Sequence, residues 1–387
     1  MIRDIDIIQI YNSRGEPTIE AKIVTEHGVF SAQAPTGKSR SRWEAKYVSP
    51  ELGIKAFRSI KNNFIGLKED DIELFDEQLE QFSMRIGTSI TTALSVSVAR
   101  ASCQNRLYNL FGKRRIFPYP VVNVLGGGAH GGNTSIQEFL VIPSGAKDFP
   151  GAVKNIVELW KEVGLRLKKY GYNPGRNDEG AWMTRQNEIK TLDMLSKIAD
   201  EYDCALGVDI AASHIFKKGR YLYPSLGKFF NSGEQLEFIK HLIKTYRLIY
   251  VEDPFHENDF SSFSELRRYT NALIVGDDLY GTQSERLKTG ITKSATNAII
   301  IKPDQAGTLT RVIETVKLAI ENKIVPVLSH RSGETTDNYI MDLAIAFSAP
   351  LIKCGVGGGE RIAKLNRGLE LWHEFEEKKM AKIRMWK

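Results

Sequence analysis

Residues 248–303 decide the fold, and they read LIYVEDPFHENDFSSFSELRRYTNALIVGDDLYGTQSERLKTGITKSATNAIIIKP. Three short apolar runs lie in this stretch, and they lead to Glu252, Asp277 and Lys302, which are 25 residues apart. A spacing of about 25 residues accommodates one strand, one helix and two loops. Continuous apolar strands that alternate with helices indicate a parallel sheet covered on both faces.

The same pattern continues on both sides of this stretch. Further apolar runs end at Asp209, His330 and Lys353, so six strand–helix units follow one another. The sequence carries no G-x-G-x-x-G after a first strand and no Walker A motif, which are the marks of nucleotide-binding open sheets. We therefore expect a closed α/β barrel of the (β/α)8 type, which occupies residues 116–387 as a catalytic domain.

The N-terminal part has a different pattern. Residues 18–24 alternate between apolar and polar, as a half-buried strand does, and residues 28–34 suit its hairpin partner. Residues 50–111 have a helical pattern, with one long buried helix expected over 90–110. We predict a small α+β domain that spans residues 1–115 and caps the barrel.

Composition limits the class of protein. The chain has 387 residues, of which 42% are hydrophobic and 26% charged, values typical of a globular protein with a large core. The net charge of +6 is dispersed, and we interpret the basic stretches as solvated surface rather than as nucleic-acid or membrane contacts. Three cysteines without a C-x-x-C pair favour a reducing compartment. With neither a signal peptide nor a long apolar span in the sequence, we expect a cytoplasmic protein.

Charged residues at the strand ends point to acid–base chemistry around a metal ion. In α/β barrels the active site lies at the carboxyl ends of the strands, where Asp209, Glu252 and Asp277 would converge. Three converging carboxylates repel one another unless a cation joins them, and an all-oxygen set favours Mg²⁺. The metal and Lys353 would both lower the pKa of Lys302, which could then act as a general base. A salt bridge to a barrel carboxylate remains the alternative for each lysine.

Eight motifs occur in the order found in the enolase family. They are NSRGEPTIE at 12–20, GGAH at 127–130 with QEF at 137–139, DEG at 178–180, VEDPF at 251–255, GDDL at 276–279, IKPDQ at 301–305, SHRSGET at 329–335 and IKCG at 352–355. The chain thus resembles enolases over essentially its whole length. The resemblance implies the modified TIM barrel of that family and the Mg²⁺-dependent removal of water from 2-phospho-D-glycerate, which gives phosphoenolpyruvate through an enediolate.

The resemblance also implies roles for individual residues. Asp209, Glu252 and Asp277 would hold a first Mg²⁺ that grips the substrate carboxylate. Lys302 would take the C2 proton, and Lys353 would offset the charge that grows on the carboxylate. Glu179, assisted by Glu138, would be protonated and would give its proton to the departing hydroxyl. The remaining matches are His130, Gln137, His330, Arg331 and Ser332 as substrate contacts, and Ser39 as ligand of a second Mg²⁺.

A few features depart from the family or stay open. The loop at 36–41 reads TGKSRS where SGASTG is usual, and we expect Ser41 to stiffen a position that favours positive φ. A related lyase for another phosphorylated or phosphonylated 2-hydroxy acid, or a catalytically silent scaffold, are the alternatives. Family resemblance suggests a homodimer or a larger assembly. The five other histidines are expected to be structural or on the surface: His27, His214, His241, His256 and His373.

Overall fold

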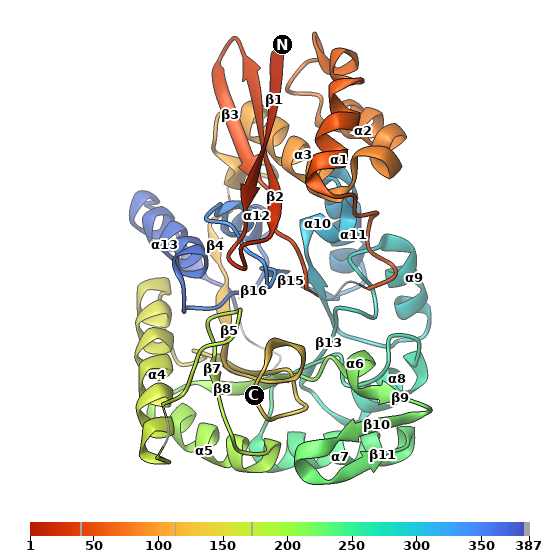
Figure 1. Ribbon diagram of the computed structural model, residues 1–387. Coiled ribbons are helices and arrows are strands. Elements are labelled where there is room, and N and C mark those ends of the chain that lie inside the picture. The colour runs from red at the N-terminus through yellow and green to blue at the C-terminus, as the bar shows by residue number, and fades with distance from the viewer. Residues whose placement is uncertain (39–40, 113, 172, 383–387) are drawn as a thin grey trace.

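The computed structural model describes residues 1–38, 41–112, 114–171 and 173–382 (Figure 1). Its larger part is a closed barrel, in which pairing between the first and last strands completes the ring. The barrel strands are β5 (Tyr119–Gly126), β6 (Glu138–Ile142), β8 (Ala205–Asp209), β12 (Tyr250–Glu252), β13 (Leu273–Gly276), β14 (Ala298–Ile301), β15 (Val325–Ser329) and β16 (Leu351–Lys353).

Helices surround the barrel and bury its outer face (Figure 1). They are α4 (Phe149–Lys169), α5 (Glu188–Glu201), α7 (Ser232–Tyr246), α8 (Phe260–Tyr269), α9 (Ser284–Thr292), α11 (Leu309–Glu321), α12 (Tyr339–Ala346) and α13 (Gly359–Glu374). The six strand–helix units predicted from the apolar runs are present, and the barrel is confirmed. Its interior is filled by strand side chains such as Tyr250, Ile300 and Val327, all fully buried.

One barrel strand runs against the predicted direction. β6 pairs antiparallel with β5 and with β8, whereas the other barrel pairs are parallel. Only residues 127–137 connect β5 to β6, and a parallel return needs a crossover of a dozen or more residues, usually with a helix. The reversal places the first residue of β6, Glu138, at the rim where the other strands end.

The N-terminal unit joins a three-stranded antiparallel sheet to three helices. The strands are β1 (Ile2–Tyr11), β2 (Pro17–Thr25) and β3 (Gly28–Gln33), and the helices are α1 (Pro50–Arg58), α2 (Ile72–Ile86) and α3 (Thr88–Ser102). The long helix expected over 90–110 is wrong in length. Gln104 and Asn105 take positive φ angles of 49° and 62°, which end the helix after Ser102.

The N-terminal unit lies against one end of the barrel (Figure 1), and buried polar contacts hold it on the carboxyl rim. Arg100 on α3 forms a double hydrogen bond with Asp337, at 2.6 and 2.8 Å. Asp76 on α2 accepts hydrogen bonds from both the backbone and the hydroxyl of Thr310, at the start of α11. The segment that follows β3 is thereby held over the barrel mouth, where Thr36 pairs with Gly333.

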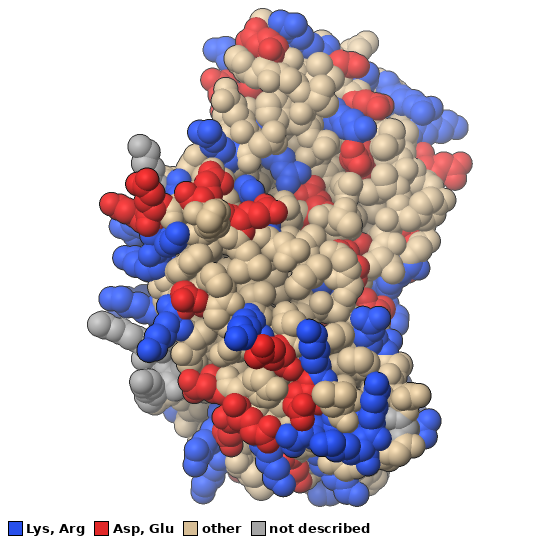
Figure 2. All heavy atoms as spheres, turned by 90° about the vertical axis from the view of Figure 1, so that its left-hand side faces the viewer, with Lys and Arg blue, Asp and Glu red and all other residues tan. Residues whose placement is uncertain are grey.

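Smaller elements complete the chain: η1 (Lys61–Phe64), η2 (Leu107–Asn109), β4 (Ile116–Phe117), η3 (Gly128–His130), β7 (Trp182–Met183), α6 (Ala212–Ile215), β9 (Phe216–Lys217), β10 (Arg220–Tyr223), η4 (Pro224–Leu226), β11 (Lys228–Phe230), α10 (Pro303–Ala306) and β17 (Lys379–Met380). Basic and acidic side chains are intermingled on the face shown in Figure 2. Within the described ranges, none of the helices is long and apolar enough to span a membrane.

Candidate active site

A single pocket at the carboxyl rim brings together most of the residues predicted to form the site. Those lining it are His130, Gln137, Glu138, Glu179, Asp209, Asp277, Lys302, His330, Arg331, Ser332 and Lys353. Glu252 is fully buried and lies against Lys353. The predicted ligand Ser39 falls outside the described residues, so its position stays a prediction.

Strand register explains why the acids are neighbours. Glu138 lies opposite Asp209 in the β6–β8 pair, and Asp209 lies opposite Glu252 in the β8–β12 pair. Asp277 follows directly after β13, the next strand of the ring. The carboxylates are therefore carried on adjacent strands at one rim, which a backbone scaffold holds in place.

Lys353 is the centre of this acidic row. Its Nζ lies 2.7 Å from Glu252 Oε1, 2.9 Å from Asp209 Oδ2 and 3.1 Å from Glu138 Oε1, and its side chain is 3% exposed. Burial by itself would lower the pKa of Lys353, but the three carboxylates raise it well above the ordinary value. The ammonium group therefore stays charged and offsets part of the acids' repulsion.

The donor set fits a hard divalent cation. Burial and the neighbouring Asp209 raise the pKa of Glu252 to about 8, and burial likewise raises the pKa of Glu138. Glu138 Oε2 is buried and has no hydrogen-bond partner among the described residues. Acids that resist ionisation indicate a shortage of positive charge, which Mg²⁺ on carboxylate oxygens would supply.

Lys302 is paired with an acid rather than free. It forms an ion pair with Asp277. Burial lowers the pKa of Lys302, but Asp277 raises this pKa by more than burial lowers it. The resulting pKa lies above the ordinary value, although the charges of Arg331 and Lys353 oppose the rise. Among the protein's own charges Asp277 thus outweighs the two cations, and the expected lowering, which involves a bound Mg²⁺, stays a prediction.

The protein's own charges favour the ionised form of Glu179, and its protonation in the loaded site stays a prediction. Burial raises its pKa, but the charges of His130, His330 and Arg361 lower it below the ordinary value. Asn123 Nδ2 donates a hydrogen bond to Glu179 Oε2 at 3.0 Å, which also favours the ionised form. The pKa of the neighbouring Glu138 is shifted in the opposite direction, mainly by burial.

Arg331 is held by two acids that the sequence did not single out. Its Nη2 lies 3.0 Å from Glu44 Oε2, and its Nε lies 3.4 Å from Asp304 Oδ2. Its side chain is 3% exposed, so the guanidinium plane is fixed. Gly37 packs directly on this group, because a Cβ built there would lie 1.8 Å from Arg331 Nη2.

Ser332 and the segment after β3 form the opposite wall. Ser332 Oγ accepts hydrogen bonds from Arg14 Nη1 at 2.6 Å and from the Lys38 amide at 2.9 Å. Lys38 Nζ donates to the Ala129 carbonyl at 2.8 Å. The positive-φ position expected at Ser41 is wrong, because Ser41 is not among the described residues with positive φ.

Several residues around the pocket were not predicted. His214, expected to be structural or on the surface, lines the pocket, as do Asp253, Asp278 and Gln305. Asp253 and Asp278 sit inside the VEDPF and GDDL motifs, so the paired acids there were a usable signal. Asp178 likewise sits inside the DEG motif, whereas Arg361 lies outside all eight motifs, and its contacts join loops distant in the sequence.

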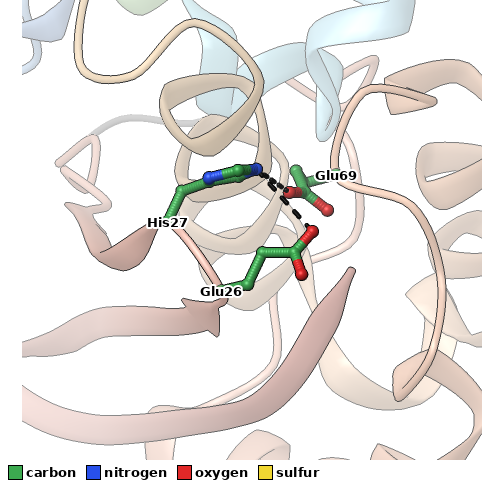
Figure 3. A group of neighbouring side chains, drawn as sticks. All are labelled: Glu26, His27 and Glu69. Atoms are coloured by element: carbon green, nitrogen blue, oxygen red, sulfur yellow. Dashed lines mark ion pairs between the residues drawn. The ribbon is translucent and has the colours of Figure 1, made fainter.

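A second cluster of possible metal ligands lies at the tip of the β2–β3 hairpin (Figure 3). His27 Nε2 lies 3.7 Å from Glu26 Oε1 and 3.6 Å from Glu69 Oε1. The α-ammonium group of Met1 lies 2.5 Å from Glu69, so a cation already compensates these acids. His27 and Glu26 are half exposed, and we interpret the group as a surface ion-pair cluster.

Taken together, a closed barrel whose rim gathers buried acids, two lysines and an arginine defines an enzyme of proton transfer next to an anionic group. Family models for the enolase N-terminal domain and the enolase C-terminal TIM barrel domain match residues 2–112 and 114–383. The chain belongs to the enolase family.

Curated relatives span nearly the whole chain. The enolase of Methanothermobacter thermautotrophicus is 38% identical, and the match covers 99% of both chains. The enolase of Archaeoglobus fulgidus is 36% identical over 99% of this chain and 100% of its own. That of Methanocorpusculum labreanum is 39% identical over 97% of this chain and 99% of its own.

Proposed function

We propose that this chain is the hydro-lyase that converts 2-phospho-D-glycerate into phosphoenolpyruvate with Mg²⁺ as cofactor. The observation that carries the proposal is the convergence of Lys302, Lys353 and Arg331 with a row of acids in one buried pocket. Such a pocket offers a base, an acid and cations for a substrate that bears both a carboxylate and a phosphate.

Asp209, Glu252 and Asp277 are proposed as the ligands of the first Mg²⁺, and Ser39 as a ligand of a second. When bound, Mg²⁺ would neutralise these acids and stabilise the charge of the enediolate. Lys353, in reach of the same acids, adds a fixed positive charge beside the substrate carboxylate. The strand ends hold these groups before the substrate arrives, so little reorganisation is needed during the reaction.

Lys302 is proposed as the base that removes the C2 proton. It must be uncharged to do so, and the ion pair with Asp277 opposes this. The base therefore becomes competent only when Asp277 is engaged by another cation. Because the charge of Lys302 depends on Asp277 in this way, proton removal is restricted to a site in which a cation is bound.

Glu179 and Glu138 are proposed to deliver a proton to the departing C3 hydroxyl. Burial raises the pKa of Glu138, whereas nearby cations lower the pKa of Glu179, whose Oε1 lies 3.5 Å from His130 Nε2. We propose that Glu179 receives a proton before it acts as the acid, with Glu138 as its partner. The opposite shifts of the two pKa values keep one proton available in the pair.

The phosphate is proposed to bind Arg331 and Ser332, because a planar guanidinium suits phosphate oxygens. His130, Gln137 and His330 would contact the rest of the substrate. A bound phosphate would compete with Glu44 and Asp304 for Arg331, so those acids hold the guanidinium in position until the ligand replaces them.

The test is the ultraviolet absorbance of phosphoenolpyruvate formed from 2-phospho-D-glycerate. We expect activity with Mg²⁺, its loss with a chelator, and its return when Mg²⁺ is added in excess. Lys302→Ala should lower kcat by about 10²–10⁴-fold. The exposed Lys288, paired with Glu285 on α9, is the matched control, and Lys288→Ala should retain activity.

Two results would change the proposal. Inactivity with 2-phospho-D-glycerate but turnover of another phosphorylated or phosphonylated 2-hydroxy acid would assign a different substrate. If the Lys302→Ala variant still fulfilled the protein's role in the cell, this result would favour the catalytically silent scaffold.

We further propose that the chain divides into domains at residues 1–115 and 116–387, that it lies in the cytoplasm, and that it assembles as a homodimer or larger homo-oligomer. Family membership supports the assembly, and size-exclusion chromatography with light scattering tests it. A mass equal to one chain of 43.6 kDa would refute the assembly.

A further inference from the structure

Arg361 is a fully buried arginine that touches the site without lining the pocket. It lies in the first turn of α13 and is 0% exposed. Its Nη1 donates to His330 Nδ1 at 2.7 Å and to the Arg331 carbonyl at 2.5 Å. On its own helix, Arg361 forms an ion pair with Glu360, with Nε 3.5 Å from Glu360 Oε1.

The other nitrogen of the guanidinium binds two further loops. Nη2 donates to the Ser332 carbonyl at 2.7 Å and to the Asp178 carbonyl at 2.9 Å. Ser332 is a proposed phosphate ligand, and Asp178 directly precedes the proposed acid Glu179. One buried side chain thus joins the segments that carry the phosphate site, the histidine and the acid.

The contact with His330 determines where the ring hydrogen sits. A guanidinium group carries only donors and has no acceptor, so the nitrogen it faces must be unprotonated. The Gly355 amide also points at His330 Nδ1, at 3.4 Å. With two donors on Nδ1, the neutral ring must carry its hydrogen on Nε2, which becomes the only ring nitrogen able to contact a bound molecule.

Another pocket histidine, His130, is in the opposite situation. His130 lies between two acids, with Nδ1 2.8 Å from Asp178 Oδ1 and Nε2 3.5 Å from Glu179 Oε1. Burial lowers the pKa of His130, but Glu179 and Asp178 together raise it by more, so the pKa of His130 lies above the ordinary value. For His330, burial and Arg361 both lower the pKa, and it falls well below the ordinary value.

We propose that Arg361 is a positioning residue that holds His330 as a neutral Nε2–H donor, so that His330 offers a hydrogen bond to a substrate oxygen and cannot act as a base. The ring would lose this property if Arg361 were removed, because protonation of Nδ1 would no longer be opposed. Charged groups that face His330 from other segments are Glu179, Lys353 and Lys364, and only Glu179 favours protonation.

The test is a ¹⁵N spectrum of the full chain labelled at its seven histidines, with His330 assigned by its loss in His330→Gln. In the unmodified chain we expect one protonated nitrogen, Nε2, and no change between about pH 6 and 8. In Arg361→Gln the ring should titrate with a pKa closer to the ordinary value of about 6.5. An Nδ1–H ring or an imidazolium in the unmodified chain would overturn the proposal.

Activity supplies a second readout, and this part rests on the proposed function. Arg361→Gln should lower kcat by about 10–100-fold, the usual effect of a partner that orients a site residue, with an added loss towards acidic pH. Arg361→Lys keeps the charge and should keep the Nε2–H ring. Arg367 lies on the same helix and pairs with Asp342 at 3.0 Å, so Arg367→Gln is the matched control and should leave the His330 spectrum unchanged.

The two proposals fail separately. If the chain does not act on 2-phospho-D-glycerate but His330 is a neutral Nε2–H ring that titrates in Arg361→Gln, the positioning role stands. If the ring spectrum is the same in Arg361→Gln, the positioning role is wrong whatever the substrate. Should Arg361→Gln not fold, the unmodified chain and Arg361→Lys still decide: loss of the Nε2–H ring in either would refute it.

Discussion

Replacing Lys353 by methionine tests the electrostatics of the rim. The change keeps the apolar stem and removes the charge that serves Asp209, Glu252 and Glu138. Removing one partner from a buried ion pair costs about 3–5 kcal/mol. Unfolding entropy of roughly 2.1 cal/mol/K per residue gives about 0.8 kcal/mol/K for 387 residues, so Tm should fall by about 4–6 °C in a chelating buffer.

The loss of stability in Lys353→Met should depend on pH in a defined direction. Burial raises the pKa of Glu252 to about 8 even beside Lys353, while in the unfolded chain it is about 4.3. The folded state therefore binds more protons than the unfolded state, and stability falls as the pH rises through this interval. The Tm difference between Lys353→Met and the unmodified chain should stay constant below this pKa and widen as the pH rises through about 8, because Glu252 then ionises beside Lys353 but stays protonated without it.

Added Mg²⁺ distinguishes this electrostatic explanation from a packing defect. Without the competing ammonium the acids should bind the ion more tightly, and a tenfold gain corresponds to about 1.4 kcal/mol, or roughly 2 °C of extra stabilisation. Lys364 is the control, because it is 1% exposed and pairs with a single acid, Glu334, at 2.6 Å. Lys364→Met should lose stability without a larger response to Mg²⁺. Equal Mg²⁺ responses in Lys353→Met and the unmodified chain, or an unchanged Tm, would refute the reasoning.

Three other substitutions give independent tests. Burial raises the pKa of Asp76 to about 6, so the stability that protonated Asp76 contributes is lost as the pH rises from about 4 to 6. Asp76→Asn should remove up to about 3 kcal/mol of this pH dependence of the free energy of unfolding, measured by urea titrations. An unchanged slope of the free energy of unfolding against pH would contradict the argument. Arg100→Met leaves Asp337 buried without its ion-pair partner and should cost about 3–5 kcal/mol by thermal denaturation. Arg166→Met removes a more exposed ion pair and should cost much less, and similar losses in the two variants would contradict the burial argument. Gly37→Ala must displace Arg331 and should raise KM about tenfold, because misplacing a substrate-positioning group by about 1 Å can weaken a site strongly. Gly233→Ala, which meets only an ordinary contact, should leave KM unchanged, and equal KM values in the two variants would contradict the argument.

Local pattern was enough for the strand–helix units. The apolar runs that lead to Asp209, Glu252, Asp277, Lys302 and Lys353 are strands in the structure, because a fully buried strand needs an unbroken apolar run of a few residues. The end of α3 was misjudged, since the positive φ angles of Gln104 and Asn105 are set by the turn that follows. The direction of β6 was missed because strand polarity depends on the connection and not on composition.

For the candidate site, too, one part could be predicted from the sequence and another part could not. Its residue types and their order could be predicted, because each motif is local and the carboxyl ends of barrel strands share one rim. The ionisation of Lys302 and Glu179 could not, since each pKa depends on which charges approach from distant segments.

The sequence by itself thus determined the barrel, the family and the set of acids, lysines and arginine that the rim presents. Only the tertiary structure decided that Lys353 lies among three acids and that Arg361 fixes the ring of His330. The physical reason is that periodicity and motifs are properties of neighbouring residues, whereas burial, tautomer and ion pairing arise where segments far apart in the chain meet.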